Sequence, residues 1–182
     1  MTLTRHAIAT FFASLAFIFP AVAQNFHKAE IKAEQLSPTT YVLYGVGGNI
    51  GLSVGDDSVF VIDDQFAPLT EKINAAIRTL TGKPVQFVLN THWHSDHTGG
   101  NENFGKAGSL IVAHENVRKR MSSDQFIELL KAKSAPSPKL ALPVVTFTRD
   151  MTFHLNGTKF LPFMCPTRIP TAIPSCTSRT AT

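Results

Sequence analysis

Cysteine is scarce in this chain of 182 residues. It has two cysteines, Cys165 and Cys176, and both lie after residue 157. Structural zinc sites are usually closed and rich in cysteine, so a metal-storage protein or a purely structural zinc protein is disfavoured. No internal repeat is found.

A long apolar run is also missing. The one strongly apolar segment is Ala7–Phe19, which is shorter than the roughly 20 residues that a membrane-spanning helix needs. It follows Arg5 and is followed by small residues that end at Ala23, as in a secretory signal peptide. We therefore predict a signal peptide over residues 1–23, a mature chain that begins near Gln24, and a periplasmic or secreted location. The residue directly after the cleavage site is Gln24 and not a cysteine, so we expect neither a lipid anchor nor stable membrane association after cleavage. A retained N-terminal anchor is the alternative.

Charge of one sign does not dominate the body of the chain. The whole sequence has a net charge of +4, but four of its 17 basic residues lie outside residues 24–157, and the 13 that remain match all 13 acidic residues. No nucleic-acid partner is therefore implied, and Arg118-Lys119-Arg120 is interpreted as the solvated face of a short helix. A small-molecule substrate is the expected partner, and the sequence does not indicate an oligomeric state.

The pattern of apolar residues predicts an α/β domain. A helix with one buried face is predicted over Leu69–Leu80, and a second helix over Asp124–Lys133. Strands alternate with these helices and with glycine-rich turns. The predicted strands are Tyr41–Tyr44, Ile50–Val54, Val59–Ile62, Val85–Asn90, Leu110–Ala113 and Met151–Leu155.

Six consecutive residues concentrate side chains that bind metals. They are His92-Trp93-His94-Ser95-Asp96-His97, and Thr98-Gly99-Gly100 follow. Imidazole nitrogens and carboxylate oxygens are the ligands of catalytic zinc sites, which keep a position open for water. We place the motif on the loop that leaves a buried strand, where the i, i+2 spacing points His92 and His94 the same way. A histidine-rich surface loop without a metal is the alternative.

This motif resembles the H-x-H-x-D-H signature of the metallo-β-lactamase superfamily. The run Val59–Asp64 resembles the strand of that family that ends in a buried aspartate, and the resemblance extends from about Tyr41 to about Gly157. It implies the αββα sandwich of the family, with only its N-terminal half present in residues 24–157. It also implies that His92 and His94 bind a first zinc ion, that Asp96 and His97 bind a second, and that Asp63 orients the metal-binding loop.

The amino-acid composition of the chain changes after Gly157. Residues 158–182 contain four prolines and no acidic residue, and they show neither a helical nor a strand period. A member of the family would continue here with a turn of the P-x-x-H-T-x-G-D type and with the remaining metal ligands, which are absent. We therefore expect residues 158–182 to be a disordered tail that is not native to the fold.

The genetic code suggests an origin for this tail. When the codons of Met164–Thr177 are read from each third base, the triplets allow VPNAHTDGDSIVHF, which resembles the missing turn. The hypothesis is a frameshift near Gly157 or Thr158 that replaced the second half of the domain with out-of-frame residues. If the hypothesis holds, the two cysteines are out-of-frame residues, and their presence does not indicate a disulfide. Sequencing of the encoding DNA tests the frameshift.

The resemblance implies hydrolysis of an amide, ester or thioester by a zinc-bound hydroxide. Asp96 would hold the second metal and orient the nucleophile or relay its proton. Export and the motif favour a β-lactamase-like hydrolase, and a glyoxalase-II-like thioesterase is the first alternative. A non-catalytic remnant is the second, because the ligand set is incomplete. An intact site of the family would hold two zinc ions, and this chain at most one, weakly.

A half domain also leaves apolar surface without a partner. Two sheets pack face to face in the complete fold, and the residues up to Gly157 supply one of them. We expect an exposed apolar face, an inactive chain and poor solubility. The residues assigned to this face are Ile50, Leu52, Val59, Val61, Phe87 and Leu89.

Overall fold

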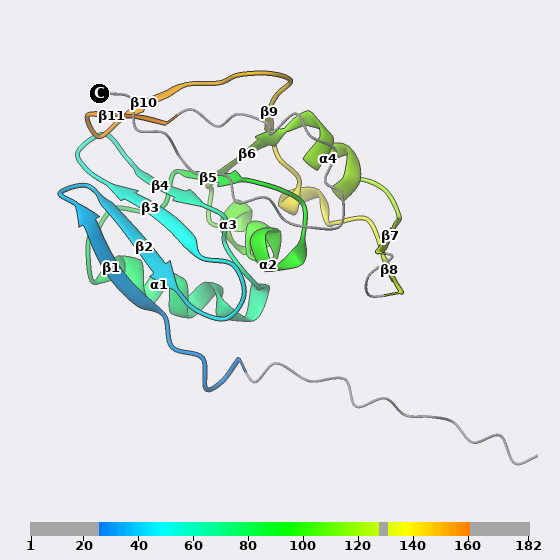
Figure 1. Cartoon of the computed structure of the whole chain (residues 1–182), viewed down its shortest axis with the longest axis horizontal. Coiled ribbons are helices and arrows are strands. Elements are labelled where there is room, and N and C mark those ends of the chain that lie inside the picture. Colours follow the sequence, from blue (N-terminus) through cyan, green and yellow to red (C-terminus); the bar gives the residue numbers. More distant parts are fainter. Residues whose placement is uncertain (1–25, 128–130, 161–182) are drawn as a thin grey trace, which may run out of the picture.

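The computed structural model describes residues 26–127 and 131–160. The predicted signal peptide and residues 161–182 of the predicted tail lie outside this part of the chain. The described residues form a mixed α/β domain with one large sheet (Figure 1), as the sequence predicts. Within that part of the chain, no helix is long and apolar enough to cross a membrane.

Seven strands form the large sheet in the order β1-β2-β3-β4-β5-β6-β9. The first four strands are antiparallel neighbours, whereas β4, β5, β6 and β9 run parallel to one another. The carboxyl ends of these parallel strands therefore meet at one edge of the sheet. The strands are β1 (Lys32–Ser37), β2 (Thr40–Tyr44), β3 (Ile50–Val54), β4 (Val59–Ile62), β5 (Phe87–Asn90), β6 (Leu110–His114) and β9 (Val145–Phe147).

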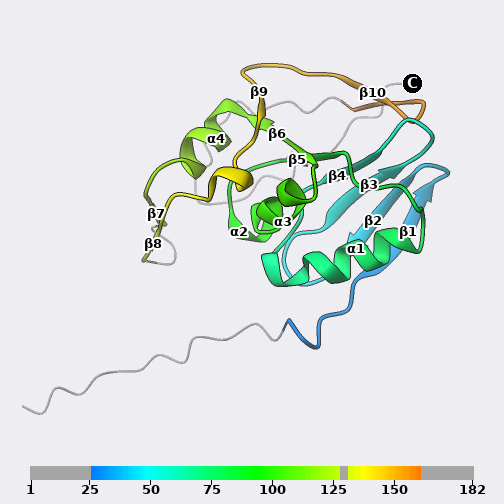
Figure 2. The same ribbon diagram turned by 180° about the vertical axis from the view of Figure 1, so that it is seen from behind.

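The helices of the described chain are short, and several lie on one side of the sheet, as the view from behind shows (Figure 2). The longest is α1, whose buried residues include Ile73 and Ile77, one turn apart on the face that the apolar spacing predicts. The helical elements are η1 (Ala67–Leu69), α1 (Thr70–Arg78), α2 (Ser95–Thr98), α3 (Asn101–Lys106), α4 (Glu115–Met121) and η3 (Lys139–Ala141).

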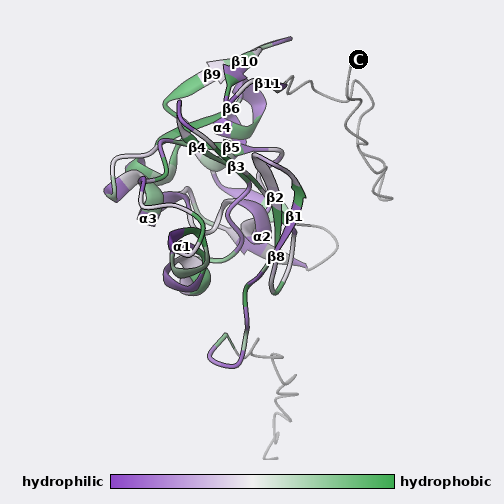
Figure 3. Ribbon diagram, turned by 90° about the vertical axis from the view of Figure 1, so that its left-hand side faces the viewer, coloured by the Kyte–Doolittle hydropathy of each residue, from purple (hydrophilic) through white to green (hydrophobic). Residues whose placement is uncertain are grey.

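The main core lies between the sheet and helices α1 and α3. Figure 3 shows the apolar residues concentrated along the central strands. Ile50, Leu52, Val59 and Val61 are at most 1% exposed and pack against Ile73 and Phe104. Their assignment to an unpartnered apolar face was therefore wrong, because these side chains point toward the helices.

The opposite face of the sheet carries a smaller apolar cluster. Phe60, Leu89 and Val112 are buried there, under Phe153 and other half-buried side chains. Phe60 and Phe153 stack edge to face with ring centroids 4.8 Å apart. The cover comes from the hairpin of β10 (Phe153–Leu155) and β11 (Thr158–Phe160), so part of this face is occupied by the chain itself.

Two predicted elements differ from the structure. In the described part of the predicted helix Asp124–Lys133, most residues lie instead in strands β7 (Gln125–Ile127) and β8 (Ala132–Ser134), which pair antiparallel. Phe126 is 52% exposed, so its side chain contributes little of the tertiary packing from which helices in proteins gain most of their stability. Strand pairing also continues past Gly157 into β11, because Asn156 and Gly157 both have positive φ, as a two-residue hairpin turn requires.

Asn156 attaches this hairpin to the large sheet. Its side-chain amide donates to Ser53 Oγ at 2.9 Å and to the Ser58 carbonyl at 3.0 Å, and its Oδ1 accepts from the Ser58 amide at 3.2 Å. Its backbone amide donates to Asp57. One side chain thus ties residues that are about 100 positions apart in the sequence.

We expect Asn156→Ala to lower the free energy of unfolding by about 2–4 kcal/mol. It removes three side-chain hydrogen bonds and places alanine at φ 54°, a conformation that asparagine tolerates better. Urea denaturation measures the change. His154→Ala, an exposed position on the same hairpin, is the control and should change stability by less than about 0.5 kcal/mol. Equal effects of the two substitutions would show that Asn156 is not the attachment.

Candidate metal centre

The histidine-rich loop lies at the carboxyl end of β5, between the end of that strand and helix α3. Asn90 is the last residue of β5, and its Nδ2 donates to Asn101 Oδ1 at 3.0 Å and to the His97 carbonyl at 3.2 Å. Asn101 returns a hydrogen bond to Asn90 at 2.9 Å and donates to the Ala141 carbonyl. Both asparagines are at most 2% exposed, so this buried network fixes both ends of the loop.

The loop brings its candidate donors together in two overlapping groups. One group is His92, His94 and Asp96, and the other is Asp63, His92 and His97. Within each group the donor atoms all lie within 4.8 Å of one another. His92 belongs to both groups, and its ring centroid lies 4.0 Å from that of His97 and 4.8 Å from that of His94. The grouping thus keeps His92 and His94 together, as the resemblance implies, but it places Asp96 and His97 in different groups.

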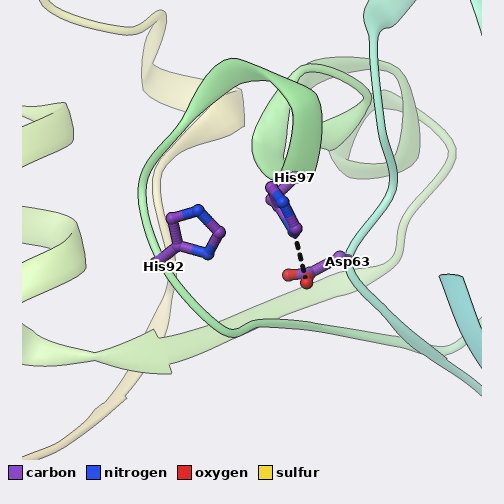
Figure 4. Close-up of side chains that lie close together, drawn as sticks. All are labelled: Asp63, His92 and His97. Atoms are coloured by element: carbon purple, nitrogen blue, oxygen red, sulfur yellow. Dashed lines mark hydrogen bonds and ion pairs between the residues drawn. The ribbon is translucent and has the colours of Figure 1, made fainter. Parts of the chain in front are cut away.

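Asp63 organises the inner side of this cluster. Its carboxylate accepts from the Thr91 amide at 2.8 Å and from the Thr91 hydroxyl at 2.7 Å. Its Oδ2 also lies 2.7 Å from Nδ1 of His97 (Figure 4). Asp63 is almost fully buried and has φ 61°. A carboxylate that holds the second ring nitrogen of a histidine orients that ring, which is the arrangement that supports metal ligands in proteins.

The other ring nitrogen of His97 faces Asp96. Nε2 of His97 lies 3.3 Å from Asp96 Oδ2. The cluster therefore runs from Asp63 through His97 to Asp96, with His92 beside it.

Asp64 and Gln65, which follow Asp63, make hydrogen bonds to the segments around His97. Asp64 is fully buried, and its Oδ1 accepts from the Gly100 amide at 2.9 Å. Gln65 is also buried and donates to the Gly48 carbonyl. A Cβ at Gly48 would lie 2.5 Å from the imidazole of His97, so only glycine allows the β2–β3 loop to approach that ring.

Several of these residues were not predicted from the sequence. Thr91, Asn90, Asn101, Asp64 and Gln65 position the loop through contacts that residue type alone does not reveal. The doublets Asp63-Asp64 and Gly99-Gly100 are the one sequence signal that points to them, because a polar pair after an apolar strand and adjacent glycines both suggest close backbone approach.

The surroundings of the three histidines lower the pKa of two of them and raise the pKa of the third. Burial, with the charge of His97, lowers the pKa of His92 to about 4, and burial also lowers the pKa of His94. Burial opposes protonation of His97 as well, but its hydrogen bond to Asp63 and the charges of Asp63 and Asp96 outweigh this and raise its pKa. His92 and His94 are thus neutral at physiological pH, the form in which imidazole binds a metal.

The donor set fits zinc. Two imidazoles and one carboxylate are the three protein ligands of a common catalytic zinc site, which leaves a fourth position open. His94 is exposed and both His92 and Asp96 are half-buried, so the group faces solvent. The site can therefore take up an ion and a small molecule from the same side.

Comparison with known proteins shows the class to which this site belongs. The sequence profile of the metallo-beta-lactamase superfamily matches residues 43–174. The match covers most of the chain, which therefore belongs to this superfamily.

Solved structures support the same fold. BJP-1, a subclass B3 metallo-β-lactamase of Bradyrhizobium japonicum, is 23% identical with a TM-score of 0.61, and the match covers 76% of this chain and 53% of that one. LRA-12, a class B3 di-zinc metallo-β-lactamase from an Alaskan soil metagenome, is 18% identical with a TM-score of 0.62, over 77% and 54% of the two chains. A Cronobacter sakazakii metallo-β-lactamase is 17% identical with a TM-score of 0.61, over 71% and 51%. The chain thus spans about half the length of the solved structures that it matches.

Proposed function

We propose that this chain carries part of the active site of an exported zinc-dependent hydrolase. The observation that supports this most directly is the convergence of His92, His94 and Asp96 within 4.8 Å on a loop that the buried Asn90–Asn101 pair holds in place. Membership of the superfamily and the similarity to a di-zinc member support zinc as the metal. The signal-like sequence of residues 1–23 supports export to the periplasm or the medium.

His92, His94 and Asp96 would hold the ion, with His97 beside them. Zinc at such a site supplies a Lewis acid and lowers the pKa of water near it toward neutrality. The chain itself supplies orientation: Asp63 fixes the ring of His97, and Asp96 lies half-exposed at the entrance. We assign Asp96 a catalytic role as well, in which its carboxylate orients the attacking water or accepts a proton from it.

The substrate we propose is a small molecule with a β-lactam amide. This rests on the B3 metallo-β-lactamases among the similar structures. A thioester, as in glyoxalase-II-like enzymes, is the second candidate, because the same donor motif serves both reactions in the superfamily. Nothing in the described residues favours nucleic acid as a partner.

We further propose that the polypeptide as written is a non-catalytic remnant. Each donor group in the described part of the chain has only three members, and residues 158–182 contain no histidine and no acidic residue. With an incomplete ligand set, we expect at most one weakly held zinc ion per chain and no turnover.

Assays of the purified mature chain test both proposals. Hydrolysis of a chromogenic lactam and of a thioester should be measured with and without added zinc, beside the zinc content of the protein. Zinc-dependent turnover of either substrate would disprove the remnant hypothesis and identify the substrate class. Absence of bound zinc under every condition would contradict the metal site itself.

A further inference from the structure

A cavity lies beside the metal-binding loop. It has a volume of about 200 Å³ and is enclosed by the loop, helix α4 and the β7–β8 hairpin. Trp93 and Ser95 of the loop line it, whereas none of His92, His94, Asp96 and His97 does. We name this cavity the Trp93 pocket. The metal donors are not part of its lining, although Trp93 lies next to His94, with ring centroids 4.9 Å apart.

The floor of the Trp93 pocket is apolar. Met121 and Ala141 line it and are about 5% exposed, and the half-buried Trp93 packs against the cluster that contains them. A flat indole beside a buried methionine and a methyl group offers a surface for a ring-sized apolar body. The floor therefore favours a ligand that is partly apolar.

A positive charge lies at the rim of this floor. The guanidinium carbon of Arg120 lies 5.6 Å from the centroid of the Trp93 ring, and Nη1 donates to the neutral side chain of Gln125 at 3.3 Å. Within the described residues Arg120 has no carboxylate partner. Glu102 also lines the pocket, but it pairs with Lys106 at 2.7 Å. The charge of Arg120 thus remains available to a ligand.

We propose that the Trp93 pocket binds a small carboxylic acid with an apolar, ring-sized body. The carboxylate would pair with the guanidinium of Arg120, whose planar fork matches two carboxylate oxygens, and the body would rest on Trp93 and Met121. Ser95 and Ser137, which also line the pocket, offer hydroxyl groups to the same carboxylate. The volume lies below the roughly 300–1,000 Å³ of sites for drug-sized ligands, so a large acid is excluded.

Trp93 makes this proposal directly measurable, because it is the only tryptophan of the chain. The mature protein, treated with a chelator to remove metal, is titrated with benzoate while its tryptophan fluorescence is recorded. Benzamide, which has the same ring and no charge, is titrated in parallel. We expect a saturable fluorescence change with benzoate and a binding affinity that is lower for benzamide by roughly tenfold, the low end for a hydrogen bond to a charged group at an exposed position.

Substitutions assign the charge to Arg120. Arg120→Gln should weaken benzoate binding by roughly tenfold and leave benzamide unchanged, and Arg120→Lys, which keeps the charge but loses the fork, should fall between. Lys119→Gln removes the same charge from the adjacent exposed position, where Lys119 pairs with Glu115, and should not alter binding. The circular dichroism of each variant verifies that it is folded.

Three results would overturn the proposal. They are the absence of saturable binding to the unmodified chain, equal affinities for benzoate and benzamide, and equal losses from Arg120→Gln and Lys119→Gln. The assay uses metal-free protein and no hydrolysis, so its outcome is independent of the proposed hydrolase function.

Discussion

Insertion of one nucleotide between the codons of Gly157 and Met164 is expected to convert this chain, for which we propose no turnover, into a zinc-dependent hydrolase. The shifted codons of Met164–Thr177 allow VPNAHTDGDSIVHF, which resembles the turn that would supply the remaining ligand of the first zinc ion in the family. With this turn, and with the later segments of the same frame that would carry the other missing ligands, added to His92, His94, Asp96 and His97, we expect two zinc ions per chain. Turnover should then rise from none to an enzymatic rate, which for hydrolases is typically about 10⁶-fold or more above the uncatalysed reaction.

The matched control is an insertion of three nucleotides at the same place, which lengthens the chain by one residue but keeps the frame. It should leave zinc content and activity as they are in the unmodified chain. The DNA sequence gives an independent test before any protein is made. If the shifted codons do not spell a histidine-threonine-x-glycine-aspartate turn, the frameshift hypothesis fails.

The β10–β11 hairpin spans the proposed position of the frameshift, near Gly157 or Thr158. Strand β11 pairs with β10 in register through Phe160, three residues beyond Gly157. The Asn156 side chain binds the β3–β4 turn from within this hairpin. An Asn-Gly turn favours pairing of many sequences, so this hairpin is compatible with both native and out-of-frame residues at 158–160. The insertion should therefore be tried on both sides of the codon of Phe160.

The central strands of the sheet, β3 to β6, were predictable because most of their residues are buried, on both faces of the sheet. Strands β2 to β6 contain runs of β-branched and aromatic residues with turn residues between them, and all five were predicted within about two residues at each end. Strand β1 was missed, since five of its six residues are exposed and show no alternation. An edge strand of this kind is defined by its partner β2 and not by its own sequence.

The metal donors were predictable for a different reason. Four of them fall within six consecutive residues, so their proximity needs no knowledge of the fold. Asp63 is 34 positions away from His97, and its role was inferred only from the resemblance to the family. The reciprocal pair Asn90 and Asn101 was not predicted, because each asparagine in isolation has the sequence signature of a turn or a helix cap.

The sequence also did not show which face of the sheet each side chain of a buried strand occupies. Val59 and Val61 face the helices, and Phe60 faces the β10–β11 hairpin. All three are apolar, so alternation of polarity does not tell which side each one takes. The sequence analysis therefore assigned Val59, Val61 and Leu89 to one face. In the structure Leu89 lies on the face opposite to Val59 and Val61.

Replacement of both His92 and His94 by alanine is expected to abolish zinc binding by the unmodified chain. These two imidazoles are the neutral donors of the group that contains Asp96. Their loss leaves one carboxylate in that group and also removes His92 from the group of Asp63 and His97. Loss of supporting contacts alone typically costs about 10- to 100-fold in metal affinity, and loss of ligands costs more. Isothermal titration with zinc should show at most one weak site before the substitutions and none after them.

His154→Ala is the control for this experiment, because His154 is exposed on β10 and belongs to neither donor group. It should leave the zinc titration unchanged. Asp63→Asn separates orientation from ligation: it keeps the size of the side chain but weakens the hold on Nδ1 of His97, which is 2.7 Å away, so the affinity should fall by about 10- to 100-fold without disappearing. Two zinc ions that remain bound to the unmodified chain during dialysis against a mild chelator would contradict the expectation of one weak site. They would mean that donors from outside the described residues complete the centre.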